Sequence, residues 1–517
     1  MTAPDVSVQV SRRSAALAGA AAGAAALGIG EFVAAIVPGA TSPILAVGDT
    51  VIALQPAGAK QFVVDLFGEA DKLLLNLFIA AVAVALAAGV GVLARSRPGM
   101  ARAVIGLGGL AALGAALRDP LADAFASVLT TAAAVATAIL VLGWLLRLAA
   151  AHGRPRGAEM PNWGRRRFIG ASAAVGLTAV ASGALGRTLL ERARTGSVVQ
   201  TGTIPQPAET AQPLPDGVSL AVDGITPIVT PNHEFYRIDT ALLVPRPRLD
   251  TWRLRVTGMV DRELEFTYDE LVAMPLVEQY VTIACVSNEV GGNLVGNAKW
   301  TGVRLKALFD EAGIDPAATQ VVGRAVDGFT VGFPTAHVIA DERESLVAVL
   351  MNDEPLPADH GFPARLIVPG LFGYVSATKW LTEIELTTWD AFDAYWVPLG
   401  WSKEGPILTQ SRIDTPPDGA GLSAGTVSIA GVAWAPDRGI QRVEVQVDDG
   451  DWQEAELSTP INDATWVQWL LRWEAAAGDH ILRVRATDGT GEVQTDEVTR
   501  PDPDGARGHH TIEVSVA

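Results

Sequence analysis

Long apolar stretches in the first 190 residues limit most strongly how this chain can fold. A helix needs about 20 apolar residues to cross a bilayer. The apolar segment of residues 43–54 is shorter than this, carries Asp49 and begins at Pro43. We therefore interpret it as a re-entrant or interfacial segment. Glu31, inside the first long stretch, should face protein or an interface rather than lipid. The sequence predicts a membrane domain over residues 1–190 with about five transmembrane helices, within Ala15–Pro38, Leu73–Leu93, Ala103–Leu117, Ala124–Leu146 and Phe168–Gly186.

The charges between these stretches predict an orientation. With a cytoplasmic start, the inner segments hold most of the arginines and the outer segments most of the acidic residues, as the positive-inside rule requires. This pattern predicts a multi-pass cell-membrane protein whose remaining part lies on the extracytoplasmic side. The inner residues are Arg12, Arg13, Arg95, Arg97, Arg102, Arg147, Arg154, Arg156 and Arg165 to Arg167, and the outer ones are Asp49, Asp65, Glu69, Asp71, Asp119 and Asp123.

The start of the last stretch has two interpretations. The run from Asn162 to Gly170, with Arg165-Arg166-Arg167-Phe168, resembles a twin-arginine export signal, which serves proteins that fold around a cofactor before export. An ordinary cytoplasmic anchor of arginines explains the same residues, and the sequence leaves both interpretations open.

Charge and composition argue against several classes of partner and cofactor. The chain has a net charge of −18, and residues 1–190 hold 15 basic and 9 acidic residues, so the first part carries +6 and the remainder −24. An acidic surface repels phosphate backbones, so we expect no nucleic-acid partner. A single cysteine excludes a four-cysteine iron–sulfur cluster, and His152 is the only histidine before residue 233, so neither iron–sulfur nor haem is expected.

The part after the membrane domain divides into three segments. Residues 191–217 are rich in Pro, Thr, Gln and Gly and predict an extended linker. Residues 218–405 mix strand-like runs such as Thr251–Val256 with helical runs such as Leu305–Ala312, which predicts an α+β domain. Residues 406–517 consist of short alternating runs, which predict an immunoglobulin-like β-sandwich. These runs are Val427–Ala433, Gln441–Val447, His480–Ala486 and His510–Ser515.

Cys285 is the candidate centre of the chemistry. It follows a strand-like run, Tyr280–Ala284, and opens a loop rich in Gly and Asn, so we expect it to be exposed rather than buried. A thiolate is a soft ligand that suits redox metals. A lone cysteine is otherwise most often a small buried apolar residue.

Three ordered segments support the chemical interpretation. They run from Cys285 to Val303, from His360 through Gly370 to Leu381, and from Thr230 to Tyr236. Together they resemble the sulfite oxidase-type molybdopterin oxidoreductases, over residues 218 to 517. The resemblance implies that Cys285 is the protein ligand of a molybdenum held by one pterin, and that the terminal sandwich serves dimerisation, which allows a homodimer. The cofactor-binding residues it implies are Asn232, Phe235, Tyr236, Asp327, His360, Arg365, Ala377, Thr378 and Lys379.

The substrate pocket departs from the family pattern. Animal and plant sulfite oxidases place an arginine two residues after an aromatic pair, whereas here Phe235-Tyr236 is followed by Arg237 and then Ile238. In an extended segment this shift turns the side chain to the opposite face. The segment looks closer to periplasmic sulfoxide reductases. Beside Cys285, Arg237 and Tyr395 are the candidate catalytic side chains, and a buried aromatic role for Tyr395 stays open.

These observations give a leading hypothesis and two alternatives. The leading one is a sulfite oxidase-like enzyme that performs two-electron oxo transfer on a small oxyanion or sulfoxide-type substrate, with a separate electron-transfer partner. One alternative is a periplasmic-type sulfoxide reductase. The other is a membrane-anchored binding module that has kept the fold without catalysis.

Overall fold

The computed structural model describes residues 10–54, 71–119, 121–150, 163–195, 205–242, 244–339 and 344–517. They form two compact units. One consists of the helices up to residue 195 with Ala241 and Leu242, and the other holds the rest from residue 205 onward.

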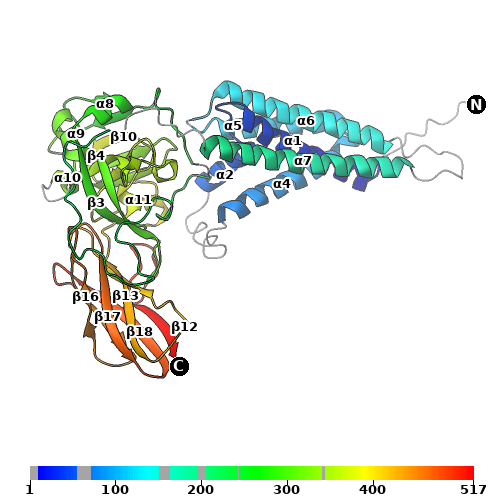
Figure 1. Cartoon of the computed structure of the whole chain (residues 1–517). Coiled ribbons are helices and arrows are strands. Elements are labelled where there is room, and N and C mark those ends of the chain that lie inside the picture. Colours follow the sequence, from blue (N-terminus) through cyan, green and yellow to red (C-terminus); the bar gives the residue numbers. More distant parts are fainter. Residues whose placement is uncertain are drawn as a thin grey trace, which may run out of the picture. The chain divides into compact units, whose positions relative to one another are not determined.

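The first unit is a helical bundle (Figure 1). Five of its described helices contain a segment that is long and apolar enough to cross a membrane, which agrees with the predicted number. The segment predicted as Ala103–Leu117 lengthens to a helix of 19 residues, and residues 43–54 form a short apolar helix. The helices are α1 Arg12–Ile36, α2 Pro43–Leu54, α4 Asp71–Ala94, α5 Pro98–Ala116, α6 Ala124–Ala150 and α7 Trp163–Thr195.

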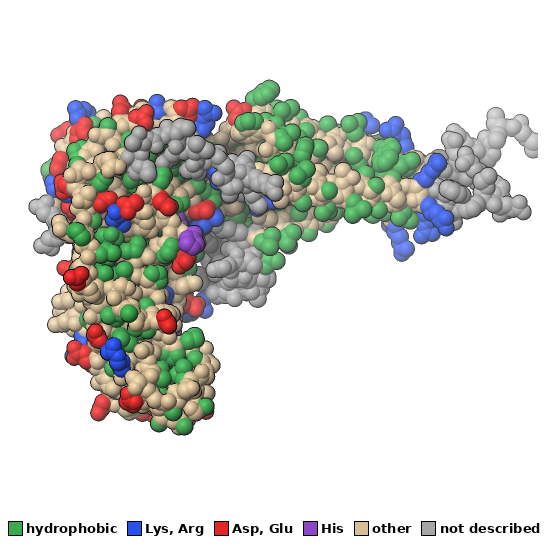
Figure 2. All heavy atoms as spheres, viewed as in Figure 1, with side chains coloured by type: hydrophobic (Ala, Val, Ile, Leu, Met, Phe, Trp, Pro, Cys, Tyr) green, Lys and Arg blue, Asp and Glu red, His purple; other side chains and the backbone are tan. Residues whose placement is uncertain are grey.

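Small residues let α1 approach its neighbours closely. A Cβ added at Gly19 would lie 2.2 Å from the carbonyl oxygen of Ala87 in α4, and one at Gly28 would lie 2.4 Å from that of Ala179 in α7. Such small-residue contacts are how membrane helices gain van der Waals packing. Glu31 is buried in this bundle and accepts a hydrogen bond of 2.6 Å from Ser42 Oγ, which confirms that it faces protein. In Figure 2 apolar side chains cover much of the bundle, and arginine and lysine side chains gather at one end.

The first part of the second unit contains two sheets and short helices, the mixed content that the sequence predicts. One sheet has the order β3-β4-β7-β8, with β9 also paired to β7, and the other has the order β2-β1-β10-β5-β6. The strands are β1 Leu254–Gly258, β2 Leu264–Phe266, β3 Leu276–Ala284, β4 Val295–Arg304, β5 Gln320–Ala325, β6 Thr330–Pro334, β7 Leu346–Met351, β8 Glu354–Pro355, β9 Arg365–Ile367 and β10 Leu381–Thr387. The helices are α8 Tyr268–Ala273, α9 Leu305–Ala312, α10 Ala336–Ile339, α11 Gly373–Ser376 and the 3-10 helices η3 Ala358–His360 and η4 Val397–Leu399.

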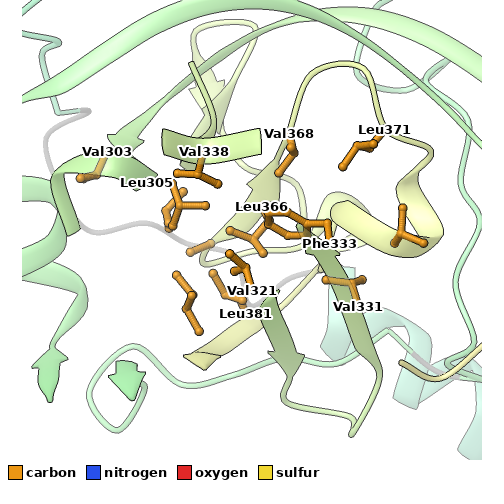
Figure 3. Close-up of a cluster of buried hydrophobic side chains, with 14 of the residues drawn as sticks. Val303, Leu305, Val321, Val331, Phe333, Val338, Leu366, Val368, Leu371 and Leu381 are labelled. Atoms are coloured by element: carbon orange, nitrogen blue, oxygen red, sulfur yellow. The ribbon is translucent and has the colours of Figure 1, made fainter. Parts of the chain in front are cut away.

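The main core combines residues of both sheets. Figure 3 shows part of it, with Val303 of β4 and Leu366 of β9 near Val321 of β5 and Phe333 of β6. A separate cluster on β3, β4 and β7 includes Val281, Trp300 and Ala348, together with Phe235. The strands that lead to Cys285 are therefore packed on both faces, which makes them a rigid support.

The C-terminal part consists of two further sheets. Their orders are β11-β13-β17-β16 and β12-β19-β18-β14-β15, and residues of both contribute to one cluster of buried side chains. Strands include all four predicted runs, while the immunoglobulin-like assignment stays a prediction. The bounds are β11 Gln410–Thr415, β12 Ala420–Leu422, β13 Gly425–Trp434, β14 Ile440–Val447, β15 Gln453–Glu454, β16 Glu456–Leu457, β17 Val467–Ala475, β18 Gly478–Asp488 and β19 His510–Val516.

Part of the predicted linker is bound to the second unit. Glu209 forms a parallel bridge with Val277 of β3, and its carboxylate accepts two hydrogen bonds from Arg304, of 2.9 and 2.7 Å. Residues 196–204 of the predicted linker lie outside the described residues.

Candidate functional site

Cys285 directly follows β3, as predicted, but it is buried, with only 7% of its surface exposed. The prediction of an exposed thiol was wrong. Its backbone N–H donates to Leu294 O at 2.9 Å, and its carbonyl accepts from Asn288 N–H at 3.1 Å, so the loop folds back over it. The phenol of Tyr236 lies close enough to Cys285 for the thiol to raise the pKa of the phenol.

Four rings from three segments form an aromatic wall next to Cys285. Phe235 stacks on Tyr236 with 5.3 Å between ring centroids, and it meets Trp300 of β4 and His360 of η3 edge-on at 5.9 and 5.5 Å. A Cβ at Gly296 of β4 would lie 2.7 Å from the Phe235 ring, so the glycine makes room for it. Burial raises the pKa of the Tyr236 phenol, the nearby Cys285 raises it further, and Arg365 opposes this rise.

Arg365 is a buried cation at the start of β9. Only 3% of it is exposed, its guanidinium lies 5.0 Å from the centroid of the Trp300 ring, and Nη1 donates to His360 O at 3.0 Å. Burial lowers its pKa to about 10, and Tyr236 partly offsets this effect. No ion pair compensates this charge among the described residues, so the site has an unbalanced positive charge available for an anion.

His360 is neutral in this site. Its Nε2 lies 2.9 Å from Asn232 O, and because a carbonyl only accepts, Nε2 carries the proton and Nδ1 is an acceptor. Burial and then Arg365 lower the pKa of His360 to about 4. Gly361, with φ +112°, continues the chain next to Lys379, whose Cα would lie 2.9 Å from an added Cβ. This close approach brings together the beginning and the end of the predicted segment that runs from His360 to Leu381.

Several buried polar atoms around Arg365 lack a hydrogen-bond partner among the described residues. They are Nδ1 of His360, Nε of Arg365, Oγ1 of Thr378 and Nδ2 of Asn288. Leaving such atoms unsatisfied costs about 1–3 kcal/mol each, so a native site that keeps several is prepared for a polar ligand. A buried guanidinium together with further donors and an acceptor fits a pterin that carries a phosphate.

Asn232 connects its loop to a neighbouring turn, and its implied role in cofactor binding stays a prediction. Its Nδ2 donates to Met351 O at 3.1 Å and to Glu354 Oε2 at 3.0 Å, and its Oδ1 accepts from Asn352 Nδ2 at 2.8 Å. The side-chain amide therefore joins its loop to the turn between β7 and β8. Asn232 contributes its backbone carbonyl to the site, where this oxygen accepts the hydrogen bond of His360.

Lys379 and Arg237 meet at one buried carboxylate. Asp239 accepts from Lys379 Nζ at 3.2 Å and from Arg237 Nε at 3.0 Å, and Arg237 also pairs with Asp359 at 3.3 Å. Burial lowers the pKa of Lys379 to about 8, although Asp239 opposes this. Sequence reasoning missed Asp239, although the spacing Arg237-x-Asp239 places both side chains on one side of an extended segment.

Ala377 and Thr378 lie between the two charged groups. Ala377 N–H donates to Gly373 O at 2.9 Å, and a Cβ at Gly373 would be 3.9 Å from Tyr236 Oη. Thr378 is fully buried, and its carbonyl accepts from Leu366 N–H at 3.0 Å. The structure therefore brings both residues to the aromatic wall and to Arg365.

Tyr395 belongs to another aromatic group. Its ring contacts Phe329 and Trp396, with centroid distances of 5.5 and 5.1 Å, and its N–H donates to Thr330 Oγ1 at 3.0 Å. These contacts correspond to the buried aromatic role that the sequence left open, and its catalytic role stays a prediction.

Asp327 should make stability depend on pH. Burial raises its pKa to about 6, Asp239 raises it further, and the N–H of Phe329 opposes this. Between pH 3.8 and 6 the folded chain keeps a proton that the unfolded chain has released, so the carboxyl costs stability above pH 6 and nothing below pH 3.8. Asp327→Asn, which keeps the acceptor for Phe329, should stabilise the chain by about 2 kcal/mol at pH 7 and leave it unchanged near pH 3.5.

Urea unfolding followed by tryptophan fluorescence at both pH values measures this effect. Asp310→Asn is the matched control, because Asp310 forms an exposed pair with Lys306. An equal gain at both pH values would show that the substitution acts through something other than the proton.

Comparison with known proteins identifies a family and several proteins to which this part of the chain is similar. Residues 241–396 match the family "Oxidoreductase molybdopterin binding domain". Mitochondrial sulfite oxidase of Mus musculus is 32% identical over 338 residues, covering 56% of this chain and 60% of that protein. Nitrate reductase [NADH] 2 of Nicotiana tabacum is 27% identical, covering 49% of this chain and 35% of that protein. The sulfane dehydrogenase SoxCD of Paracoccus pantotrophus is a similar solved structure, with TM-score 0.49, 23% identity and coverage of 56% and 81%.

The chain spans about 60% of the length of the mammalian sulfite oxidases that it matches, and the helices up to residue 195 lie outside the family match. The family match and the relatives support a molybdenum–pterin cofactor. Residues 241–396 therefore resemble the molybdopterin-binding domain of the sulfite oxidase type of oxidoreductases.

Proposed function

We propose that this chain is a membrane-anchored oxidoreductase that carries out two-electron oxo transfer on a small substrate outside the cytoplasm. The observation that carries the proposal is the meeting of Cys285, Tyr236 and Arg365 from three distant segments, together with buried polar atoms that have no hydrogen-bond partner in the described part of the chain. When bound, the molybdenum–pterin group supplies the redox chemistry and the oxo group. Electrons pass to or from a separate partner protein.

The side chains around Cys285 have distinct proposed roles. Cys285 ligates the metal, and Arg365 and Lys379 bind the anionic end of the pterin with Thr378 and the backbone of Ala377. Phe235 and Tyr236 lie along the pterin rings, while Asn232 positions His360, whose Nδ1 accepts a hydrogen bond from the pterin. Asp327, which is protonated below about pH 6, can donate to the ring system. Burial of Phe235 and Cys285 excludes water from the reacting side.

We propose the same division of the chain as the sequence predicts. Residues 1–190 form the membrane domain, 191–217 the linker, 218–405 the molybdopterin domain and 406–517 an immunoglobulin-like β-sandwich that serves dimerisation. The arginines at one end of the helical bundle support a cytoplasmic position for that end.

Metal and substrate assays test the proposal. Protein from a host that makes the cofactor should contain about one molybdenum and one pterin per chain. It should then turn over sulfite with an electron acceptor, or a sulfoxide with an electron donor. Folded protein from such a host with neither metal nor pterin would contradict the proposal and favour a non-catalytic binding module.

Reduction of a neutral sulfoxide is the second candidate, and Arg237 favours it. Its guanidinium already pairs with the carboxylates of Asp239 and Asp359, so its charge is compensated before any substrate arrives. A small oxyanion gains less from such an arginine than from an uncompensated one. Relative kcat/KM values for sulfite and for a dialkyl sulfoxide distinguish the two candidates.

A further inference from the structure

The loop that contains Cys285 is a closed hairpin between β3 and β4. Besides the two backbone bonds of Cys285, the Oδ1 of Asn288 accepts from Leu294 N–H at 2.7 Å, and Gly292 N–H donates to Glu289 O at 2.9 Å. Asn288 is itself buried. Because these bonds connect the tip of the loop to both sides of Cys285, a movement of the tip is transmitted to the thiol.

Arg412 of β11 holds the tip from the C-terminal part of the unit. Its Nη1 donates to Gly292 O at 2.7 Å. The same guanidinium donates from Nε to Asp414 at 2.6 Å and from Nη2 to Thr226 Oγ1 at 2.8 Å. Asp414 in turn accepts from Thr226 N–H at 2.9 Å. Because the contacts to Asp414 and Thr226 fix the guanidinium, Arg412 presents Nη1 to the loop in one orientation.

His510 of β19 supports the neighbouring residue of the tip. Gly291 has φ +77°, and a Cβ added there would lie 2.2 Å from Cδ2 of His510. The ring is fixed from behind, because Nδ1 of His510 accepts from Ile413 N–H at 3.0 Å. Position 291 therefore requires glycine for two reasons: its backbone φ is positive, and the imidazole ring of His510 leaves no space for a Cβ.

The strand that leads to Cys285 is held by the same C-terminal part. Thr282 N–H donates to Ala464 O at 2.9 Å, Thr282 Oγ1 accepts from Trp466 N–H at 2.8 Å, and Asn462 Nδ2 donates to Tyr280 O at 3.1 Å. Trp466 also belongs to the core of the α+β part. Both ends of the Cys285 segment therefore contact residues beyond position 405.

We propose that Arg412 and His510 are positioning residues, and that the C-terminal β-region sets the position of the Cys285 thiol in addition to any part in dimerisation. The metal-binding consequence rests on the proposed function, whereas the effect on the thiol does not. A charge-assisted hydrogen bond shifts an equilibrium by roughly 10- to 100-fold. We therefore expect the opening of this loop to become more frequent by that factor when Arg412 is replaced.

Alkylation of the thiol measures this opening directly. Cys285 is the only cysteine, so iodoacetamide labelling of the full-length chain in detergent, from cells that cannot make the pterin, reports on this loop alone. The double variant Arg412→Gln with Asp414→Asn avoids an uncompensated buried carboxylate. It should be labelled roughly 10- to 100-fold faster than the parent chain. Arg472→Gln, which removes an exposed ion pair with Glu456, is the matched control and should stay within about twofold.

A second pair of variants tests the contact from the loop side and keeps the proposal testable if the Arg412 variant does not fold. Gly291→Ala forces a methyl group into the His510 ring and should accelerate labelling. His510→Ala removes the obstacle, so the double variant should be labelled more slowly than Gly291→Ala alone. Equal rates for the parent chain and the folded variants, or additive effects of the two changes, would overturn the proposal.

The metal-loaded enzyme provides an independent readout. Electron paramagnetic resonance of the one-electron-reduced centre should change in Gly291→Ala and return toward the parent spectrum in Gly291→Ala/His510→Ala. If the parent chain binds no molybdenum, the proposed function fails while the labelling result still decides the role of the loop contacts. If molybdenum is bound and labelling is unchanged in every folded variant, the positioning role alone fails.

Discussion

Replacing Cys285 with serine should abolish turnover while the chain stays folded. Loss of residues that merely orient a metal ligand costs about 10- to 100-fold in activity or affinity, so loss of the ligand itself should cost more than about 100-fold. Serine is close in volume, and its hydroxyl enters a largely buried site, which should cost about 1–3 kcal/mol of stability. Turnover, molybdenum content and circular dichroism of the purified protein measure the three effects.

Ser287→Ala is the matched control for this variant. Ser287 is exposed and lies in the same loop, two residues after Cys285, so its loss should leave turnover within about twofold. Near-parental turnover in folded Cys285→Ser protein would remove Cys285 from the site.

Replacing Arg365 with methionine should have opposite effects on cofactor binding and on stability. A pKa near 10 instead of 12.5 means that the buried guanidinium costs the cofactor-free chain about 3 kcal/mol. Buried charges replaced by apolar groups of similar volume often stabilise a protein by about 1–4 kcal/mol. Arg365→Met should therefore raise the unfolding free energy of the cofactor-free chain, while pterin retention falls by more than about 100-fold because the proposed phosphate contact is lost.

Two measurements check this prediction: pterin released on denaturation of protein from a cofactor-producing host, and urea unfolding of cofactor-free protein. Arg255→Met removes an arginine from an exposed pair with Glu383 and should change neither by much. Parental pterin content in Arg365→Met would exclude Arg365 as an anchor of the cofactor. A loss of stability would show that the arginine serves the fold instead.

The sequence predicts well where local spacing carries the information. The helix Leu305–Ala312 has the predicted bounds, because residues 305, 308, 309 and 312 place one apolar face on the core. The helices that are long and apolar enough to cross a membrane were predictable from the length of their apolar runs. Strands of the C-terminal sheets followed from alternation and from turns such as Asp448–Asp451.

The sequence predicts poorly where distant segments meet. The expected exposure of Cys285 was wrong, because Leu294 returns onto its backbone and Tyr236 lies near its thiol. Neither contact can be deduced from the neighbouring residues. The hydrogen bonds of the Asn232 amide were not predictable either, because their partners lie more than a hundred positions later in the chain. Asp239 was missed because a single carboxylate that serves two cations leaves no periodic pattern.

The contact between His510 and the Cys285 loop also constrains when the protein can mature. About 220 residues separate the two, and a ribosome that adds about 5–20 residues per second needs roughly 10–45 s to synthesise them. During that interval the helices of the first unit have already been made, while the thiol loop lacks the strand that supports it. Under the proposed function, the early helices are therefore made well before the thiol loop is complete enough to hold the cofactor. A cell that translocates the second unit before β19 has folded would deliver a protein whose thiol is not yet held in place.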